Sequence, residues 1–223
     1  MKRKVKDLIY DQFSRCPKAL SNPKRLEILD LLTQGEKTVE TIAEQADLGV
    51  KNASAQLKEL RSALLVSSRR DGKNIYYSIA NEGIKTFLLQ LRRFNEFHFS
   101  EVQKIASDYL GEEVNLKSTS RKQLLAKVKK GDVILLDVRP PDEYAYGHLP
   151  YAVSVPISKL SKELKLLPKD KEIVAYCRGP YCFFATEAVE LLRKKGYKVS
   201  RLSDSLMDWA AEGLPIESSK VSL

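Results

Sequence analysis

The spacing of apolar residues changes partway along the chain. Up to about residue 95 they recur every three or four positions, the spacing of amphipathic helices, whereas after about residue 130 short β-branched runs alternate with helical patterns. The second arrangement is typical of a parallel sheet covered by helices. The pattern therefore predicts a helix-rich domain at residues 1–97, a helical connector at 98–117 and an α/β domain at 118–223.

Three amphipathic helices are predicted in the first domain. Pro23 suits the first turn of a helix, because its missing N–H has no partner there in any case. The Asp47–Gly49 turn separates a short helix from a longer one at about Val50–Ala63, as in a helix-turn-helix unit. The apolar residues expected on the buried faces are Leu26, Leu29, Leu32, Val39, Ile42, Ala43, Ala46, Val50, Ala53, Leu57 and Leu60.

A basic hairpin is predicted after the third helix. Asp71–Gly72 lies between two β-prone runs, and both residues tolerate the positive φ of a tight hairpin turn. Residues 50–77 carry six basic and two acidic side chains, a balance suited to a phosphate backbone. A solvated helix face also explains such a charge run, but the order of helices, turn and hairpin favours DNA binding. Expected base contacts are Lys51, Asn52, Ser54 and Gln56, and expected phosphate contacts are Lys58, Arg69, Arg70 and Lys73.

Residues 15–80 contain three extended motifs, LSNPKRLEILDLL, TVETIAEQADLGVKNASAQLKELRSALLV and RRDGKNIYYSI. In these motifs the chain resembles the winged-helix repressors of the ArsR type. The resemblance implies a winged helix-turn-helix that binds a double-stranded DNA operator as a homodimer, paired through the first helix and the helix at about Glu82–Phe97. The chain departs from the family at Gln56, where His is common, and at Leu64, where Gly is common. The family's metal-binding cysteines are missing from the helix at 39–46, so metal sensing is not expected there.

A loop with two cysteines follows a predicted strand in the second domain. CRGPYC, residues 177–182, comes directly after the strand at Ile173–Tyr176 and directly before a helix at Phe183–Lys195. The other predicted elements are the strands Val133–Val138, Ala152–Val155 and Lys198–Leu202 and the helix Arg121–Lys130. Ligands of parallel α/β sheets bind beyond the carboxyl ends of the strands, so this loop is the expected site.

The position of the loop suits a thiolate. A helix N-terminus points unpaired N–H groups into the preceding loop and carries about half a positive charge. In such surroundings the pKa of a cysteine falls from about 8.5 to roughly 3.5–7.5. We therefore expect Cys177 to be a nucleophile near neutral pH, with Arg178 adding positive charge. The same cradle can hold a persulfide, so the loop favours sulfur transfer.

Three motifs extend beyond this loop: DVRPPDEYAYGHLPYAVSVP at 137–156, YCRGPYC ending at 182, and WAAEGLP at 209–215. In these motifs the region from about residue 118 to 215 resembles the rhodanese family of sulfurtransferases. The resemblance implies Cys177 as the catalytic sulfur acceptor. It implies a substrate-binding loop of Arg178, Gly179, Pro180, Tyr181 and Cys182 and a supporting network of Asp137, Arg139, Glu143 and His148. We expect His148 to hydrogen-bond within the Gly147–Pro150 turn, and Asp137 and Arg139 to form paired scaffolding.

The chain departs from this family within the loop. Cys182 stands where thiosulfate-using members often have Arg, so thiosulfate activity is expected to be weak. A second sulfur can attack a persulfide or sulfenate on Cys177 and form a disulfide, or it can simply be a tolerated small residue. SDS at 203–205 stands where Gly-Gly is common, so the packing there is expected to differ. A phosphatase or arsenate reductase needs Arg six positions after the nucleophile, where this chain has Phe183, so that class is disfavoured.

Composition narrows the class of protein further. The chain has 38 Lys and Arg against 29 Asp and Glu, a formal charge of +9, most of it in the first half. Its cysteines, Cys16, Cys177 and Cys182, are typical of reduced cytosolic thiols and cannot form a disulfide framework. Cys16 is expected to be a small packed residue. No zinc spacing, secretion leader or membrane-spanning stretch is recognisable, so we expect a cytoplasmic protein without a metal or cofactor.

These predictions favour a dimeric transcription regulator that binds or transfers sulfane sulfur through Cys177. The sulfur donor is expected to be a small persulfide, polysulfide or thiosulfate, and persulfidation is expected to shift the affinity for DNA. The alternative is a sulfurtransferase enzyme whose DNA-binding domain mainly regulates its own operon. Turnover lost in Cys177→Ser favours the enzyme, whereas negligible turnover of the unmodified protein favours the sensor.

Overall fold

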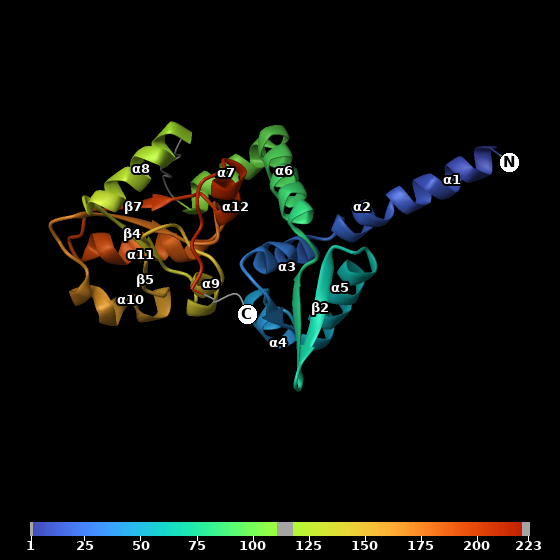
Figure 1. The fold of residues 1–223 in the computed structure, drawn as a ribbon, viewed down its shortest axis with the longest axis horizontal. Coiled ribbons are helices and arrows are strands. Elements are labelled where there is room, and N and C mark those ends of the chain that lie inside the picture. Colours follow the sequence, from blue (N-terminus) through green and yellow to red (C-terminus); the bar gives the residue numbers. More distant parts are fainter. Residues whose placement is uncertain (1, 111–117, 220–223) are drawn as a thin grey trace. The chain divides into compact units, whose positions relative to one another are not determined.

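The computed structural model describes residues 2–110 and 118–219 of the chain (Figure 1). These residues form two compact units, Met1–Phe87 and Leu88–Leu223. The boundary between the units lies inside one long helix, α6 (Glu82–His98). The helical connector predicted at 98–117 lies partly outside the described residues.

The first unit is a helical domain with a small antiparallel sheet. Its elements are α1 (Lys2–Phe13), α2 (Arg15–Leu20), α3 (Pro23–Thr33), β1 (Lys37–Thr38), α4 (Val39–Gln45), α5 (Val50–Ser62), β2 (Val66–Asp71) and β3 (Asn74–Ile79). The sheet has the order β1-β3-β2, and the β2–β3 hairpin turns at residues 71–74 with Gly72 at a φ of 59°. The fold is the winged helix-turn-helix that the pattern predicts.

Local sequence explains where the helices of the first unit begin. The side chain of Asn22 accepts a hydrogen bond from the backbone N–H of Arg25 at 3.1 Å, and Pro23 follows at the first helical position. Thr38 caps α4 in the same way. Leu64 adopts a φ of 61°, a left-handed conformation that explains why glycine is common at this place.

The core of the first unit contains most, but not all, of the apolar residues expected there. Ile42, Ala53, Leu57 and Leu60 are fully buried. The prediction of burial is wrong for Leu26 and Val50, which are 39% and 49% exposed. Neither residue lies on the buried face of its helix. The buried faces consist of Ile28, Leu29, Leu31 and Leu32 in α3 and of Ala53, Leu57 and Leu60 in α5.

The second unit contains a parallel sheet with helices on both faces (Figure 1). After the second half of α6 its elements are α7 (Ser100–Leu110), α8 (Ser118–Lys130), β4 (Val133–Asp137), α9 (Pro141–Tyr146), β5 (Val153–Ser154), α10 (Ile157–Glu163), the 3₁₀ turn η1 (Leu164–Leu166), β6 (Glu172–Tyr176), α11 (Phe183–Lys194), β7 (Val199–Leu202) and α12 (Leu206–Ala211). The strand order is β5-β4-β6-β7. The strand expected at Ala152–Val155 pairs at only two residues, Val153 and Ser154.

Alternate residues of the strands build the two halves of this core. On one face Leu136, Ile173 and Ala175 pack with α10 and α11. On the other face Leu135 and Val174 pack with α8 and α12. The central strand β6 is buried on both faces. Cys177 directly follows its last residue, so this cysteine lies at the carboxyl edge of a rigid sheet.

In the described part of the chain, no helix is long and apolar enough to cross a bilayer.

Candidate functional site

Helix α5 presents a polar face of the expected composition. Lys51, Asn52, Ser54 and Lys58 are exposed, and Gln56 is half-buried. Gln56 donates to the Asn52 side chain at 2.9 Å and accepts from Arg25 at 3.1 Å. The two amides therefore lie together on one helix face, held in place by an arginine of α3.

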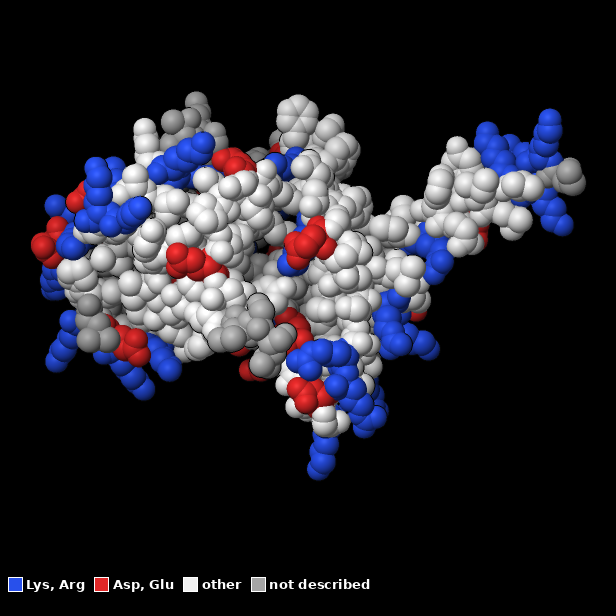
Figure 2. Space-filling model, viewed as in Figure 1, with Lys and Arg blue, Asp and Glu red and all other residues white. Residues whose placement is uncertain are grey.

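The tip of the hairpin carries paired charges (Figure 2). Arg69 donates to both carboxylate oxygens of Glu36, at 2.7 and 2.8 Å, and to Asp71 at 3.2 Å. These hydrogen bonds raise the pKa of Arg69. Arg70 donates to the carbonyl oxygen of Gly72, and Lys73 is exposed. Arg69, expected to bind a phosphate, is thus held by carboxylates in the structure.

The cysteine loop lies between β6 and α11. Cys177 is only 1% exposed, whereas Cys182 is half-buried and is the N-cap residue of α11. The Cys177 sulfur lies 3.4 Å from the carbonyl oxygen of Cys182 and 3.9 Å from that of Gly179. Gly179 has a φ of 146°, a conformation that favours glycine. The loop wraps closely around the sulfur, as the sequence predicts.

Main-chain amides surround both sulfur atoms. The backbone amides of Gly179 and Ala185 favour a negative charge on Cys177 and lower its pKa, and those of Arg178 and Phe184 do the same for Cys182. The cradle is therefore built from both the loop and the first turn of α11. This is the arrangement expected for an anion at a helix N-terminus.

The structure favours the negative charge on Cys182, whereas the sequence predicts it on Cys177. A hydrogen bond from the Cys177 thiol, together with the amides and the charge of Arg178, outweighs burial and lowers the pKa of Cys182 to about 7. Burial raises the pKa of Cys177, and the neighbouring sulfur raises it further. The prediction of a lowered pKa at Cys177 is wrong for this state of the loop, because Cys182 caps the helix while Cys177 lies deeper.

Arg178 is directed away from the sulfur atoms toward Glu143. Its guanidinium donates to both carboxylate oxygens, at 3.0 and 2.7 Å, and lies over the ring of Phe184 at 5.1 Å. The Glu143 side chain is fully buried and that of Arg178 is 11% exposed. The ion pair therefore ties the loop to α9, and the support expected of Glu143 is a direct contact.

Asp137 and Arg139 form an ion pair with no solvent exposure. The guanidinium donates to both oxygens of Asp137, the closest at 2.6 Å, and to the carbonyl oxygen of Gly147 at 2.7 Å. Asp137 ends β4, next to the strand that leads into the cysteine loop. The expected pairing is present, and the scaffolding role of the two residues stays a prediction.

His148 has a different partner from the one expected. Its Nδ1 atom lies 2.8 Å from the carbonyl oxygen of Tyr144, and the two rings are stacked at 3.8 Å. Its backbone pairs with Glu217 in an isolated β-bridge. The expected hydrogen bond within the Gly147–Pro150 turn is therefore not the one His148 makes. Its ring packs on Tyr144 of α9.

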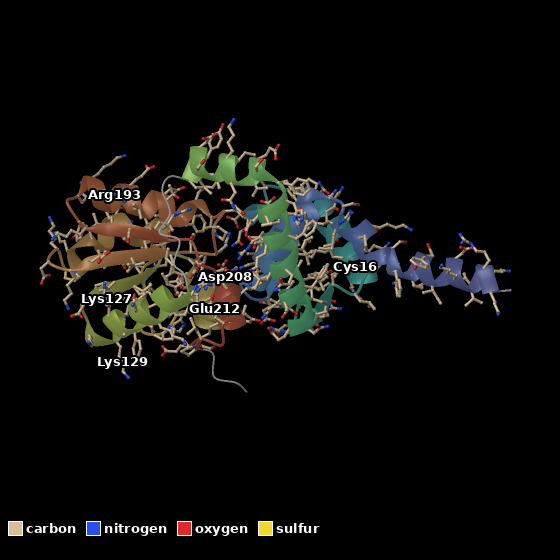
Figure 3. All side chains as sticks on the ribbon, turned by 90° about the horizontal axis from the view of Figure 1, so that it is seen from above. Cys16, Lys127, Lys129, Arg193, Asp208 and Glu212 are labelled. Atoms are coloured by element: carbon tan, nitrogen blue, oxygen red, sulfur yellow. The ribbon has the colours of Figure 1, made fainter. Side chains whose placement is uncertain are left out.

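Three further polar residues support the loop and were missed. Arg201, 3% exposed on β7, donates to the carbonyl oxygen of Pro180 at 3.3 Å. Arg92 of α6 donates to both oxygens of Asp208, which Figure 3 labels on α12. An arginine inside an apolar strand pattern is the signal that could have identified Arg201. No sequence signal connects Arg92 and Asp208.

The SDS segment at 203–205 is held by side-chain contacts. Asp204 accepts from Arg121 of α8 at 2.5 and 2.9 Å. Ser205 caps α12 in a capping box with Asp208. The packing at this segment, which the sequence predicts to differ from that of the family, consists of this ion pair and this capping box.

Within the stretches 2–110 and 118–219, no group of three or more His, Cys, Asp or Glu side chains could hold a metal ion.

Comparison with known proteins gives two family matches and one relative of nearly full length. Residues 20–69 match a helix-turn-helix domain, and residues 120–212 match a rhodanese-like domain. The chain is 42% identical over 212 residues to the HTH-type transcriptional regulator Rv0324 of Mycobacterium tuberculosis, covering 95% of this chain and 93% of that protein.

Other relatives match one part of the chain each. A protein named sulfurtransferase from Allochromatium vinosum is 35% identical over 102 residues, which cover 45% of this chain and 92% of that protein. Among solved structures, the homodimeric winged helix-turn-helix DNA-binding domain Mb0332 of Mycobacterium bovis, described as a possible ArsR-family regulator, is 41% identical. It covers 42% of this chain and 87% of its own, with a TM-score of 0.41.

Proposed function

Because this chain belongs to the family of HTH-type transcriptional regulators and carries a rhodanese-like domain, we propose that it regulates transcription in response to sulfane sulfur bound at Cys177. The observation that carries the proposal is the cradle of four main-chain amides around two sulfur atoms, in a chain that also binds DNA. The regulator acts on operator DNA in the cytoplasm, where thiols are kept reduced.

The DNA-binding surface in this proposal is the polar face of α5 with the adjacent hairpin. The exposed side chains of Lys51, Asn52 and Ser54 suit base edges, and Lys58, Arg70 and Lys73 suit phosphates. The hydrogen bond to Asn52 holds the Gln56 amide on the same helix face, and from there we propose that Gln56 contacts a base. Arg69 reaches a phosphate once the Glu36 carboxylate releases it.

We also propose that the protein acts as a homodimer through α1. No residue of this helix is buried in the single chain. Its apolar residues Val5, Leu8, Ile9 and Phe13 follow helical spacing and are 47–69% exposed. Such a face is stable in water when a second copy covers it, and two copies would present two α5 helices to successive half-sites.

The sulfur step is an exchange between two sulfur–sulfur bonds. The Cys177 thiolate attacks the terminal sulfane sulfur of an inorganic polysulfide or a small persulfide. A new S–S bond forms at the Cys177 sulfur, the S–S bond in the donor breaks, and its electron pair leaves with the shortened donor. Cys182, with its pKa near 7, takes the proton of the Cys177 thiol as the attack begins. The donor carries the oxidising equivalent, so no further oxidant is consumed.

The fate of the persulfide depends on Cys182. Its thiolate can attack the Cys177 sulfur, forming a Cys177–Cys182 disulfide and releasing hydrosulfide. The two sulfurs lie within hydrogen-bonding reach of each other, and both cysteines are free thiols in the structure. The persulfide therefore has a route to a second, oxidised state of the same loop.

Operator affinity before and after sulfur loading tests the sensing function. The probe is a duplex that the reduced full-length protein recovers from a random-sequence library, and the donor is inorganic polysulfide. We expect loading to change the affinity by about fivefold or more. Cys177→Ser should abolish the change and Cys16→Ser should leave it intact. Equal affinities of loaded and reduced protein would dispose of the sensing claim.

A second candidate function is enzymatic sulfur transfer. The likeness of the second domain to a protein named sulfurtransferase favours it. In that case the protein turns over a sulfur donor with cyanide or a thiol as acceptor, and Cys177→Ser loses the turnover. Negligible turnover of the unmodified protein leaves sensing as the function of the domain.

A further inference from the structure

The second half of α6 touches the cysteine loop. Glu96 accepts a hydrogen bond from the hydroxyl group of Tyr181, four residues after Cys177, at 2.7 Å. One turn earlier, Arg92 lies 3.3 Å from the same carboxylate and donates to Asp208 at 2.6 and 2.7 Å. All four residues belong to the second unit. A continuous polar chain therefore runs from the loop through α6 to α12.

Gly179 places the loop close to this chain of contacts. A Cβ atom added there would lie 3.2 Å from the Cβ of Ser205 and 3.6 Å from Nη1 of Arg92. Ser205 is itself the cap of α12 and lies 3.5 Å from the Arg92 guanidinium. A shift of the loop at Gly179 therefore changes its packing against Arg92 directly.

The two contacts of α6 differ in strength. The Arg92–Asp208 pair is bidentate, with side chains 17% and 8% exposed. Arg92 and Ser205 outweigh burial and lower the pKa of Asp208, so the carboxylate stays charged. Tyr181, by contrast, is 42% exposed, and its hydroxyl group donates to Glu96. Arg92 is thus an anchor, and the Tyr181–Glu96 bond is a latch that can open.

There is space for the latch to open. A cavity of about 200 Å³ lies beside it, lined by residues of α6, α7, α8 and the loop, among them Arg93, Glu96, Pro180 and Tyr181. Its charged lining residues are balanced, three arginines against three carboxylates. The cavity therefore does not suit a small anion, but it gives Tyr181 room to move without displacing packed side chains.

The buried sulfur requires such movement. Cys177 is 1% exposed, and the carbonyl oxygens of the loop lie 3.4 and 3.9 Å from its sulfur. A donor molecule therefore reaches the Cys177 sulfur only when part of the loop moves aside, and the added sulfur then forms an S–S bond of about 2.05 Å. Donor entry and persulfide formation both widen the loop. Its outer segment, Pro180–Tyr181, is the part that borders the cavity.

The other end of α6 lies directly after the wing. β3 ends at Ile79 and α6 begins at Glu82, so only two residues separate them. A helix is a stiff element, and a change at its last turns reaches its first turn through the hydrogen-bonded backbone.

We propose that the Tyr181–Glu96 latch reports the sulfur state of Cys177 to α6: a sulfur atom added at Cys177 widens the loop, opens the latch and frees the last turn of α6, so that the helix turns about its Arg92–Asp208 contact. This inference rests on the proposed sensing function and adds the route by which the signal leaves the loop. Glu96 and Tyr181 act as positioning residues.

Tyr181→Phe tests the latch, because it removes one hydroxyl group and keeps the ring. The full-length variant is loaded with inorganic polysulfide, and the persulfide is measured as a mass gain of about 32 Da on the loop peptide. Operator affinity is measured before and after loading, with the library-selected duplex as probe. Tyr109→Phe, the same change at a tyrosine that is 70% exposed on α7, is the matched control.

The latch predicts that Tyr181→Phe takes up sulfur like the unmodified protein but loses the change in affinity. The reduced variant should already bind DNA as the loaded unmodified protein does, to within about twofold. Tyr109→Phe should respond fully. If Tyr181→Phe takes up sulfur and still shifts its affinity like the unmodified protein, the latch is wrong and the sensing function stands. If the unmodified protein gains the mass without changing its affinity, the sensing function fails and the latch with it.

Discussion

The sulfur of Cys177 lies 3.4 Å from the carbonyl oxygen of Cys182 and interacts with the Cys182 thiol, so the two cysteines of the loop ionise as a pair. The first proton lost leaves the negative charge on Cys182, which caps α11 and accepts further hydrogen bonds from main-chain amides. The buried Cys177 keeps its proton until a donor arrives. In this arrangement the nucleophile, Cys177, stays protonated and buried, and the base that accepts its proton, Cys182, lies beside it.

The pair makes a prediction for the pH dependence of thiol reactivity. Alkylation of Cys182 by iodoacetamide should rise with pH through a midpoint near the pKa of about 7. In Cys177→Ala the donated S–H is gone, so the Cys182 midpoint should move to higher pH. Mass spectrometry of the alkylated peptides measures both. Cys16, whose pKa is raised by partial burial, is the internal control and should react only at higher pH. An unchanged midpoint in Cys177→Ala would show that the S–H does not stabilise the Cys182 thiolate.

We predict that breaking the Arg139–Asp137 ion pair causes a large loss of stability in the second unit. Arg139→Gln leaves a fully buried carboxylate without its bidentate partner, which should cost about 3–5 kcal/mol. Trp209, the single tryptophan of the chain, is fully buried in this unit, so its fluorescence during urea unfolding measures the change. Arg3→Gln, which removes an exposed ion pair on α1, should not alter this transition. A loss below about 1 kcal/mol in Arg139→Gln would contradict a scaffolding role.

Because Glu36 forms an ion pair with Arg69, we predict that removing the Glu36 charge strengthens DNA binding. Glu36→Gln weakens the hold on Arg69, which is then available to a phosphate. Affinity should increase, and the slope of log K against log salt should become steeper by about one. Glu172→Gln makes the same charge change at an exposed position of the second unit and corrects for net charge. Identical slopes for the two variants would mean that Arg69 does not reach the DNA.

The exposed face of α1 predicts the oligomeric state. Leu8→Glu places a charge in the middle of the apolar face, and the protein should sediment as a monomer at concentrations where the unmodified chain is a dimer. Lys4→Glu lies on the same helix, outside the apolar set, and should remain dimeric. A dimer that survives Leu8→Glu would place the interface elsewhere.

Sequence reasoning was most successful where a feature depends on neighbouring residues. The start of α3 at Pro23, the turn at Gly72 and the place of Cys177 between a strand and a helix are all local, and the structure contains each of them. Helix periodicity also identified Leu57 as core, although it failed for Val50 because an apolar residue can also lie in water.

Contacts between distant residues were beyond the sequence. Arg92 and Asp208 are separated by 116 positions, and nothing in either neighbourhood indicates the other. The Arg178–Glu143 pair has the same character, since both residues were expected at the site but not in contact. The pKa of Cys177 was mispredicted because burial depth, which the sequence does not contain, decides which of two sulfurs carries the charge. The roles of the site residues and the limits of the three segments stay predictions.

The mass of the loop peptide, from protein recovered from cells without reductant, tests the central claim most directly. Sulfane sulfur on Cys177 predicts a gain of about 32 Da that disappears on reduction, is absent in Cys177→Ser and persists in Cys16→Ser. A peptide at its unmodified mass both in cells and after exposure to polysulfide would contradict the account and leave the second domain without its proposed chemistry.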